Sequence, residues 1–190
     1  MSLDEEVAAF RGRGDLEQAA TVAIRTLGPE ILGYLTALMH DPSDASDVFS
    51  QFAEDLWRGL PGFRGDASLR TWAYRLARHA ALRRERDPFR RRGERLGTTQ
   101  ASAIAGSILA STVVRHELRA RQLARLRSRL DEGERTLLIL RVDRGLAWGE
   151  VADVLAGEDG ARPAEGALRK RFERLKDKLA RAAREEGLIE

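Results

Sequence analysis

The sequence predicts an all-α protein, built as two small helical domains joined by a flexible linker. Apolar residues recur at spacings of three and four over most of the 190 residues, and no segment sustains the alternation of a strand. Glycine and proline separate the periodic segments. In residues 87–111 an arginine run leads into GTTQASAIAGS, which is small, polar and weakly periodic and is expected to be partly helical near its end. We therefore expect a helical domain over residues 1–86 with its core in 22–86, a linker over 87–111 and a second helical domain over 112–190.

Composition limits the class of protein. A hydrophobic content of 43% supports real cores, and the absence of cysteine excludes disulfides, zinc–thiolate sites and thiol catalysis. The longest strongly apolar run, Leu137–Leu140, is far too short to cross a bilayer. The N-terminal residues are acidic and lack an apolar stretch, so they do not form a signal peptide. We expect a cytoplasmic protein.

Two helices are predicted in the first third of the chain. Apolar residues at helical spacing over 31–39 predict a helix that follows the Gly28-Pro29 pair. Asp41 then suits the N-cap of a second helix and Pro42 its first helical position. A continuous apolar stripe carries this second helix to Gly59.

A third helix is predicted to open at Asp66 or Ser68 and to stop before Pro88. Tyr74 lies off its apolar stripe and is expected to be exposed, whereas Trp72 lies on the stripe and suits core packing and base stacking about equally. The predicted inward positions are Leu69, Trp72, Ala73, Leu76 and Ala80.

The second domain is predicted to hold four helices. The predicted segments are Val113–Leu130, Glu132–Val142, Leu146–Ala156 and Ala164–Arg184, with residues 157–163 as a turn. A short helix, a turn and then a basic helix have the layout of a helix-turn-helix, whose second helix enters the DNA major groove. Its apolar stripe contains Leu168, Phe172, Leu175 and Leu179.

The charge is clustered although the net charge is only +3. Residues 63–95 carry eleven arginines against four acids, and residues 162–184 carry nine bases against three acids. Two separate basic blocks fit two contacts on one long polyanion. The simpler alternative is that these arginines and lysines are solvated side chains on helix surfaces and bind no polyanion. Aromatic residues among the arginines of 63–86 favour single-stranded nucleic acid, because bases stack on aromatic faces.

Catalysis has little support. His40, His79 and His116 have no spacing that would bring them together as ligands, and no glycine-rich phosphate loop precedes a helix. Asp44 and Asp47 suit favourable contacts with a helix N-terminus better than acid–base work. We expect no enzyme activity, no metal site and no cofactor.

Three segments resemble the sigma-70 family of bacterial transcription initiation factors, in the short extracytoplasmic-function (ECF) form. DPSDASDVFSQFAEDLW resembles the helix that binds the clamp helices of the largest polymerase subunit, and FRGDASLRTWAYRLARHAALRRER resembles the segment that melts and recognises the minus-10 element. LDEGERTLLILRVDRGLAWGEVADVLAG followed by EGALRKRFERLKDKL resembles the helix-turn-helix that reads the minus-35 element and packs on the polymerase flap. The resemblance implies core RNA polymerase and promoter DNA, both duplex and non-template single strand, as partners, together with an anti-sigma factor.

The resemblance also implies roles for residues at matching positions. The polymerase-facing residues would be Asp44, Asp47, Gln51 and Asp55. The loop that captures a flipped minus-10 base would be Phe63, Arg64, Gly65, Asp66, Ala67 and Ser68. Melting and strand holding would fall to Arg70, Trp72, Tyr74, Arg75, Arg78 and Arg83. The minus-35 duplex would meet Glu165, Arg169, Lys170, Arg171 and Arg174.

Three departures from the family pattern stand out. Ser50-Gln51 replaces the usual Gln-Glu, Ala167 replaces a small hydroxyl residue, and extra residues lengthen the turn at 157–164. The longer turn bears on the angle of the recognition helix. Two other functions stay open at this point: a helix-turn-helix regulator that acts without polymerase, and a helical adaptor that binds no DNA. The acidic and basic aromatic helices at 41–86 favour the sigma factor, since a repressor has no need of that pair.

Overall fold

The computed structural model describes residues 1–39, 41–86, 99–112, 129–157 and 160–185, and every regular element in this part of the chain is helical. This confirms the predicted all-α fold. The chain divides into two compact units, Met1–Arg115 and His116–Glu190. The predicted helix over Val113–Leu130 lies almost wholly outside the described residues. Residues 87–98 of the predicted linker also lie outside them.

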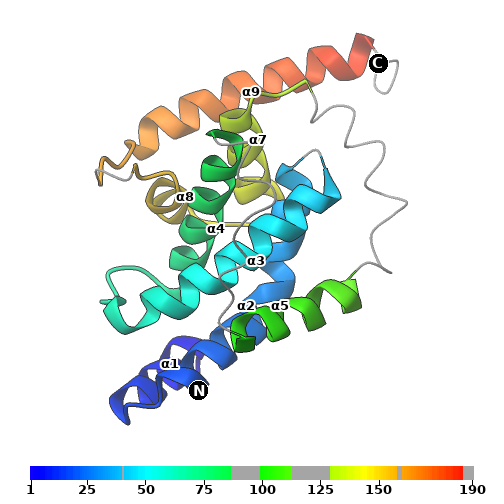
Figure 1. Ribbon diagram of the computed structural model, residues 1–190. Coiled ribbons are helices and arrows are strands. Elements are labelled where there is room, and N and C mark those ends of the chain that lie inside the picture. Colours follow the sequence, from blue (N-terminus) through cyan, green and yellow to red (C-terminus); the bar gives the residue numbers. More distant parts are fainter. Residues whose placement is uncertain (40, 87–98, 113–128, 158–159, 186–190) are drawn as a thin grey trace. The chain divides into compact units, whose positions relative to one another are not determined.

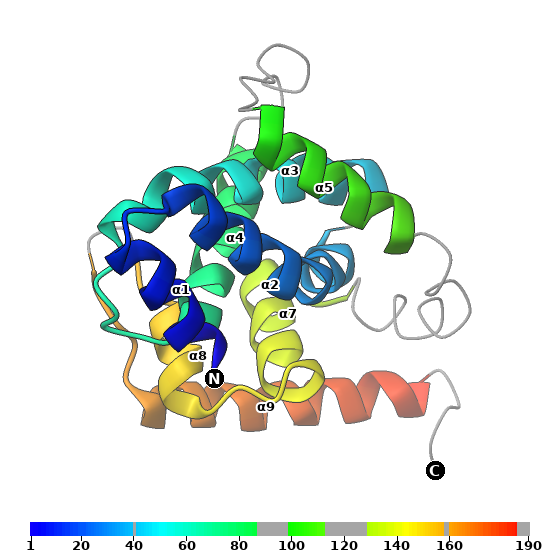
Figure 2. The ribbon, with the colours of Figure 1, turned by 90° about the horizontal axis from the view of Figure 1, so that it is seen from below.

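The first unit contains α1 (Leu3–Gly12), α2 (Leu16–Leu38), α3 (Pro42–Gly59), the short 3₁₀ turn η1 (Leu60–Gly62), α4 (Leu69–Arg86) and α5 (Thr99–Thr112). Helix α2 packs against all four other α-helices and forms the centre of the unit (Figure 2). The core of the first unit contains four fully buried aromatic rings, which are Tyr34, Phe49, Phe52 and Tyr74.

Local sequence explains where α3 and α4 begin. Asp41 accepts a hydrogen bond from the Ser43 amide at 2.7 Å, and Pro42 occupies the first turn, as predicted. Ser68 is the residue that caps α4, because its Oγ accepts from the Thr71 amide at 3.1 Å. Of the two predicted starting points for this helix, Ser68 is therefore correct.

Helix α2 is longer than predicted. It starts at Leu16 and continues through Pro29, which was expected to precede the helix. Proline inside a helix costs about 3 kcal/mol, because it removes a hydrogen bond and its ring crowds the preceding turn. Buried Ile24, Leu27 and Ile31 lie on both sides of the proline, and their packing outweighs this cost.

The predicted linker differs most from the structure. Residues Thr99–Thr112 form α5, which packs on α2 and α3 and belongs to the first unit (Figure 1). Four apolar side chains are buried under it, which are Ala101, Ile104, Ala105 and Ile108. Gly28 allows this close approach, since a Cβ atom there would lie 2.5 Å from Ile108 Cδ1. The helical part of the first unit thus extends beyond residue 86.

The second unit contains α7 (Glu132–Leu138), a π-helical turn η3 (Ile139–Asp143), α8 (Trp148–Val154) and α9 (Glu165–Glu185). Helix α9 lies across α7 and α8, and buries Leu168 and Leu175 of its predicted stripe (Figure 1). Phe172 is partly exposed and meets Trp148 of α8 edge-to-face, at 5.6 Å between ring centroids. The predicted short helix and long basic helix are both present, while residues 158 and 159 of the predicted turn lie outside the described residues.

Candidate nucleic-acid interface

The loop between η1 and α4 presents an exposed polar tip beside a pair of aromatic rings. The side chains of Arg64 and Asp66 are 84% and 80% exposed and lie 3.4 Å apart, on either side of Gly65, whose φ is +82°. Phe63 stacks on Trp72 of α4 with ring centroids 4.9 Å apart. Partly exposed aromatic rings next to charged and polar groups form a surface on which an unpaired base can stack.

Trp72 is half-buried, so part of its ring packs against the protein and part is open to solvent. The indole lies over Gly59, where a Cβ atom would be 3.1 Å from Trp72 Cζ2. The absence of a side chain at residue 59 therefore gives the indole its place against the end of α3.

The prediction that Tyr74 is exposed is wrong. Tyr74 is fully buried, its hydroxyl donates to Glu30 of α2 at 2.8 Å, and its ring meets Tyr34 edge-to-face at 5.3 Å. The apolar stripe of α4, taken alone, predicts that Tyr74 faces solvent. In the structure, a carboxylate from α2 accepts the hydrogen bond of the phenol, which allows the phenol to be buried. Direct contact of Tyr74 with DNA is therefore excluded in this structure. Leu76, predicted to point inward, is partly exposed instead.

The arginines of α4 divide into anchors and free cations. Arg70 forms an ion pair with Glu30, with Nε 3.1 and 3.2 Å from the two carboxylate oxygens, and its guanidinium lies 5.5 Å from the Tyr74 ring centroid. Arg83 forms an ion pair with Asp55 of α3. Among the described residues, the partly exposed Arg75 and Arg78 have no ion-pair partner, so they are the α4 cations best placed to take phosphates.

The acidic face of α3 follows the predicted spacing but carries an unpredicted set of partners. Asp44, Asp47, Gln51 and Asp55 lie on one helix face, and Gln51 Nε2 donates to Asp55 at 2.9 Å. Arg84 of α4 binds Asp44 at 2.6 Å and Asp47 at 3.0 Å.

The Arg84 ion pairs have two consequences. The hydrogen bond to Asp44 raises the pKa of Arg84 above its ordinary value, so the cation stays charged through the physiological range. The end of α4 also neutralises much of the acidic face. Asp47 remains the more accessible of the two carboxylates, with 41% of its side chain exposed against 25% for Asp44.

In the second unit, the four predicted DNA-facing cations of α9 are all exposed, which are Arg169, Lys170, Arg171 and Arg174. Arg169 pairs with the partly exposed Glu165 one turn earlier at 3.2 Å. Arg171 also reaches back to Asp131 at 3.6 Å and fills the space over Gly133. Arg171 is therefore the cation of this set that also contacts the start of α7.

Sequence reasoning missed Arg162, which fastens the long turn. Its Nε donates to Asp153 at 2.6 Å and its Nη2 to the Gly149 carbonyl at 3.0 Å, so it holds the residues before α9 onto α8. The same nitrogen lies 3.9 Å from Glu165 in the first turn of α9. Nothing in the spacing of the sequence marks Arg162 among its many neighbouring arginines.

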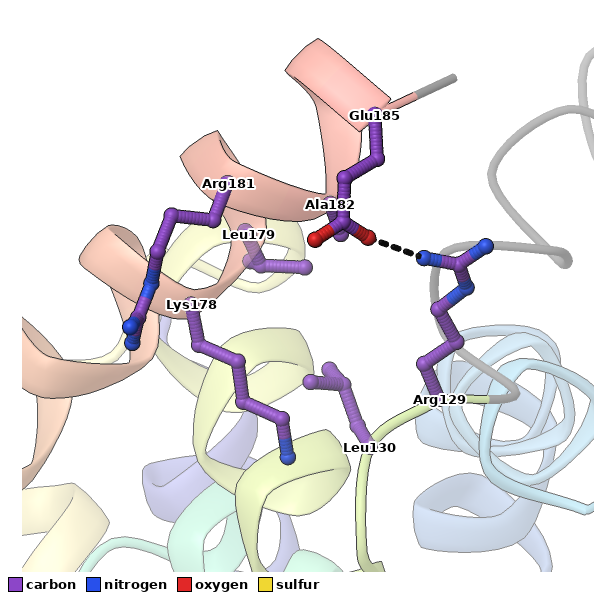
Figure 3. A pocket seen from close by; sticks show the side chains of 7 residues that line it. All are labelled: Arg129, Leu130, Lys178, Leu179, Arg181, Ala182 and Glu185. Atoms are coloured by element: carbon purple, nitrogen blue, oxygen red, sulfur yellow. Dashed lines mark hydrogen bonds and ion pairs between the residues drawn. The ribbon is translucent and has the colours of Figure 1, made fainter.

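A hollow of about 260 Å³ lies at the far end of α9 (Figure 3). Its floor is apolar and its rim is charged, but Glu185 pairs with Arg129 at 3.2 Å and Glu134 pairs with Lys178 at 2.6 Å. Because both ion pairs occupy the rim, the hollow holds no unpaired charge cluster for chemistry. It is lined by Arg129, Leu130, Lys178, Leu179, Arg181, Ala182 and Glu185.

The described residues lack two further kinds of feature. In this part of the chain, histidines and carboxylates do not gather in groups of three or more that could hold a metal ion. None of the described helices is both long and apolar enough to cross a membrane.

Comparisons with known proteins agree with this geometry. The family model Sigma-70 region 2 matches residues 23–92. The RNA polymerase sigma-H factor of Pseudomonas aeruginosa is 26% identical over 163 residues, which cover 80% of this chain and 82% of that protein. RNA polymerase sigma factor YlaC of Bacillus subtilis is 30% identical over 130 residues, covering 66% of this chain and 73% of that protein.

The fold is also that of a solved protein, CnrH. CnrH, whose structure was determined in complex with the cytosolic domain of CnrY, has a TM-score of 0.64 to this chain at 19% identity, covering 95% of this chain and 97% of CnrH. At this identity the likeness shows the fold alone, while the sequence relatives carry the assignment. The chain belongs to the sigma-70 family of bacterial RNA polymerase sigma factors, in the extracytoplasmic-function form, and is a transcription initiation factor.

Proposed function

We propose that the protein binds core RNA polymerase through α3 and directs it to promoters, where the first unit opens the minus-10 element and the second reads the minus-35 element. The observation that carries this proposal is the exposed loop at 63–66 next to the Phe63–Trp72 stack, with Arg75 and Arg78 further along α4. Such a surface suits unpaired bases and their backbone. The factor supplies binding energy for opening and performs no chemistry of its own.

The second unit supports duplex recognition by a different route. The first turns of α9 present Glu165, Arg169 and Lys170 outward, while Arg162 fixes the turn that leads into the helix. A helix N-terminus with acceptors and cations suits base edges and phosphates in the major groove. Arg171 takes a structural place in this proposal and is not assigned to DNA.

Polymerase binding is assigned to the α3 face around Asp47, because this carboxylate is the more exposed of the two bound by Arg84. The clamp helices of the largest subunit and the flap are the proposed contact points of the first and second units. The CnrH–CnrY complex supports adding a sequestering protein partner to this list.

Asp47→Arg tests the assignment directly. The change places a cation beside Arg84, and we expect binding of core polymerase to fall at least tenfold in a titration, while helical circular dichroism is retained. Glu17→Arg is the matched control, since it makes the same charge change on an exposed position of α2. It also removes a hydrogen bond from Gln100 of α5, so its circular dichroism is measured as well. Wild-type protein that folds and binds duplex DNA but forms no complex with core polymerase would instead favour a regulator that acts without polymerase.

A further inference from the structure

We propose that α1 is the positioning element of the promoter-opening loop, and that Asp4 and Arg11 hold its two ends. This inference rests on the proposed function, since it assigns α1 a task in the capture of unpaired bases. The sequence pattern gave α1 no role.

Asp4 holds the end of the loop that enters α4. Its Oδ1 accepts a hydrogen bond from the Leu69 amide at 2.7 Å, across 65 residues of chain. Ser68 caps the Thr71 amide of the same turn, so the two side chains satisfy different amides at the start of α4. A carboxylate at this place is also favoured by the positive end of the helix dipole.

Arg11 holds the end of the loop that leaves η1. Its Nη2 donates to the Pro61 carbonyl at 3.3 Å, and its guanidinium lies 5.8 Å from the centroid of the Phe63 ring. Phe63 is the ring that stacks on Trp72, so Arg11 reaches the aromatic surface proposed to meet a base.

The spacing of these residues makes α1 suited to this task. Asp4, Val7 and Arg11 are separated by three and four residues and share one helix face, about 10 Å long. Val7 is 2% exposed and seats the middle of that face in the core. A capping box between Ser2 and Glu5 fixes the start of α1, so the two polar side chains project from a helix that is anchored at its centre and capped at its first turn.

The contacts from α1 fix the two ends of the loop and leave its tip free. Arg64 and Asp66 at the tip are almost fully exposed, while Pro61, Phe63 and Leu69 are held from α1. A loop whose ends are held in place loses less conformational entropy when it binds a base. Loss of either contact from α1 should therefore weaken base capture without altering the α3 surface that contacts polymerase.

The experiment uses the full chain assembled with core polymerase. Asp4→Ala should reduce binding of a labelled pool of short single-stranded DNA, randomised in sequence, by about 3- to 30-fold, the range expected for loss of a helix cap. Arg11→Ala should reduce it by about 2- to 5-fold, as for a partly exposed hydrogen bond. Core-polymerase affinity should stay within twofold of wild type for both. Glu6→Ala and Arg25→Ala are the matched controls, because they remove the same charges from α1 and α2 but leave the bonds of Asp4 and Arg11 to the loop in place.

A second measurement does not depend on polymerase. Trypsin cleavage after Arg64 in the free protein should become several-fold faster in Asp4→Ala than in Glu6→Ala, because the loop is released at one end. Unchanged cleavage and unchanged DNA binding in both α1 variants would overturn the inference. Faster cleavage with wild-type DNA binding would overturn the role in base capture. Failure of the wild-type chain to bind core polymerase would refute the proposed function instead, and the cleavage rates would still decide whether α1 holds the loop.

Discussion

Replacement of Tyr74 by phenylalanine separates a role in the core from a role on DNA. The ring is fully buried against Tyr34, and only the hydroxyl, which donates to Glu30 at 2.8 Å, is removed by the change. Glu30 keeps its ion pair with Arg70, so the carboxylate is not left without a partner. The variant thus deletes the hydrogen bond to Glu30 and keeps the ring in place.

The magnitude follows from the environment of that hydrogen bond. A hydrogen bond to a charged group contributes about 1.5–3 kcal/mol. The Glu30 side chain is 27% exposed, so water can replace part of the lost interaction. We expect Tyr74→Phe to lower the free energy of unfolding by about 1–2 kcal/mol. Tyr74→Ala should lower it by about 3–5 kcal/mol, since it also empties the space of the ring.

Urea unfolding followed by tryptophan fluorescence measures this effect. A Trp148→Phe background leaves Trp57 and Trp72 as the only tryptophans, both in the first unit, so the signal reports that unit. At a urea slope typical of small domains, the midpoint should fall by about 0.5–1 M. Promoter opening, read by permanganate reactivity of thymines, should equal that of the wild type at temperatures where both are folded. Unchanged stability together with reduced opening would refute the burial argument and return Tyr74 to the DNA surface.

Three further predictions test other contacts. Arg84→Met should destabilise the first unit by about 2–4 kcal/mol, because Asp44 and Asp47 lose a cation whose side chain is only 15% exposed, and a urea midpoint equal to that of wild type would contradict this. Ile108→Ala should lower the stability of the same unit by about 2–3 kcal/mol, since Ile108 is 6% exposed under α5; a neutral result would mean that residues 99–112 behave as a linker. Arg162→Ala should weaken binding of the holoenzyme to duplex minus-35 DNA by about 3- to 10-fold in a filter-binding assay. Arg162→Lys should not restore binding, because a single ammonium cannot reach both Asp153 and the Gly149 carbonyl. Wild-type binding by either variant would show that the contacts of Arg162 with α8 are not needed for binding of DNA.

Local signals predicted much of this fold. The start of α3 at Asp41 and Pro42 could be read directly, because capping and proline geometry involve only neighbouring residues. The same holds for Ser68 at the start of α4. The buried Leu168 and Leu175 of α9 follow from helical periodicity, which any amphipathic helix shows.

The errors have a common physical cause, which is a partner from a distant segment. Tyr74 is buried because Glu30 satisfies its hydroxyl, and nothing in the sequence of α4 reveals that carboxylate. Residues 99–112 are rich in alanine and serine and resemble a linker, yet Ile108 packs closely on Gly28 of α2, a contact that the local pattern does not reveal. The candidate site divides in the same way: the loop at 63–68 was proposed from family resemblance, whereas the pairing of Arg83 and Arg84 with α3 depends on a distant segment and could not be predicted.

The attachment of Arg162 to α8 also bears on the length of the turn before α9. One side chain ties the last residues before α9 to the preceding helix, through Asp153 and the Gly149 carbonyl. The entropic cost of closing a loop grows slowly with its length, so a longer turn costs little stability by itself. A contact such as that of Arg162 acts on a different property, because it fixes where the chain enters the next helix whatever the length of the turn before it.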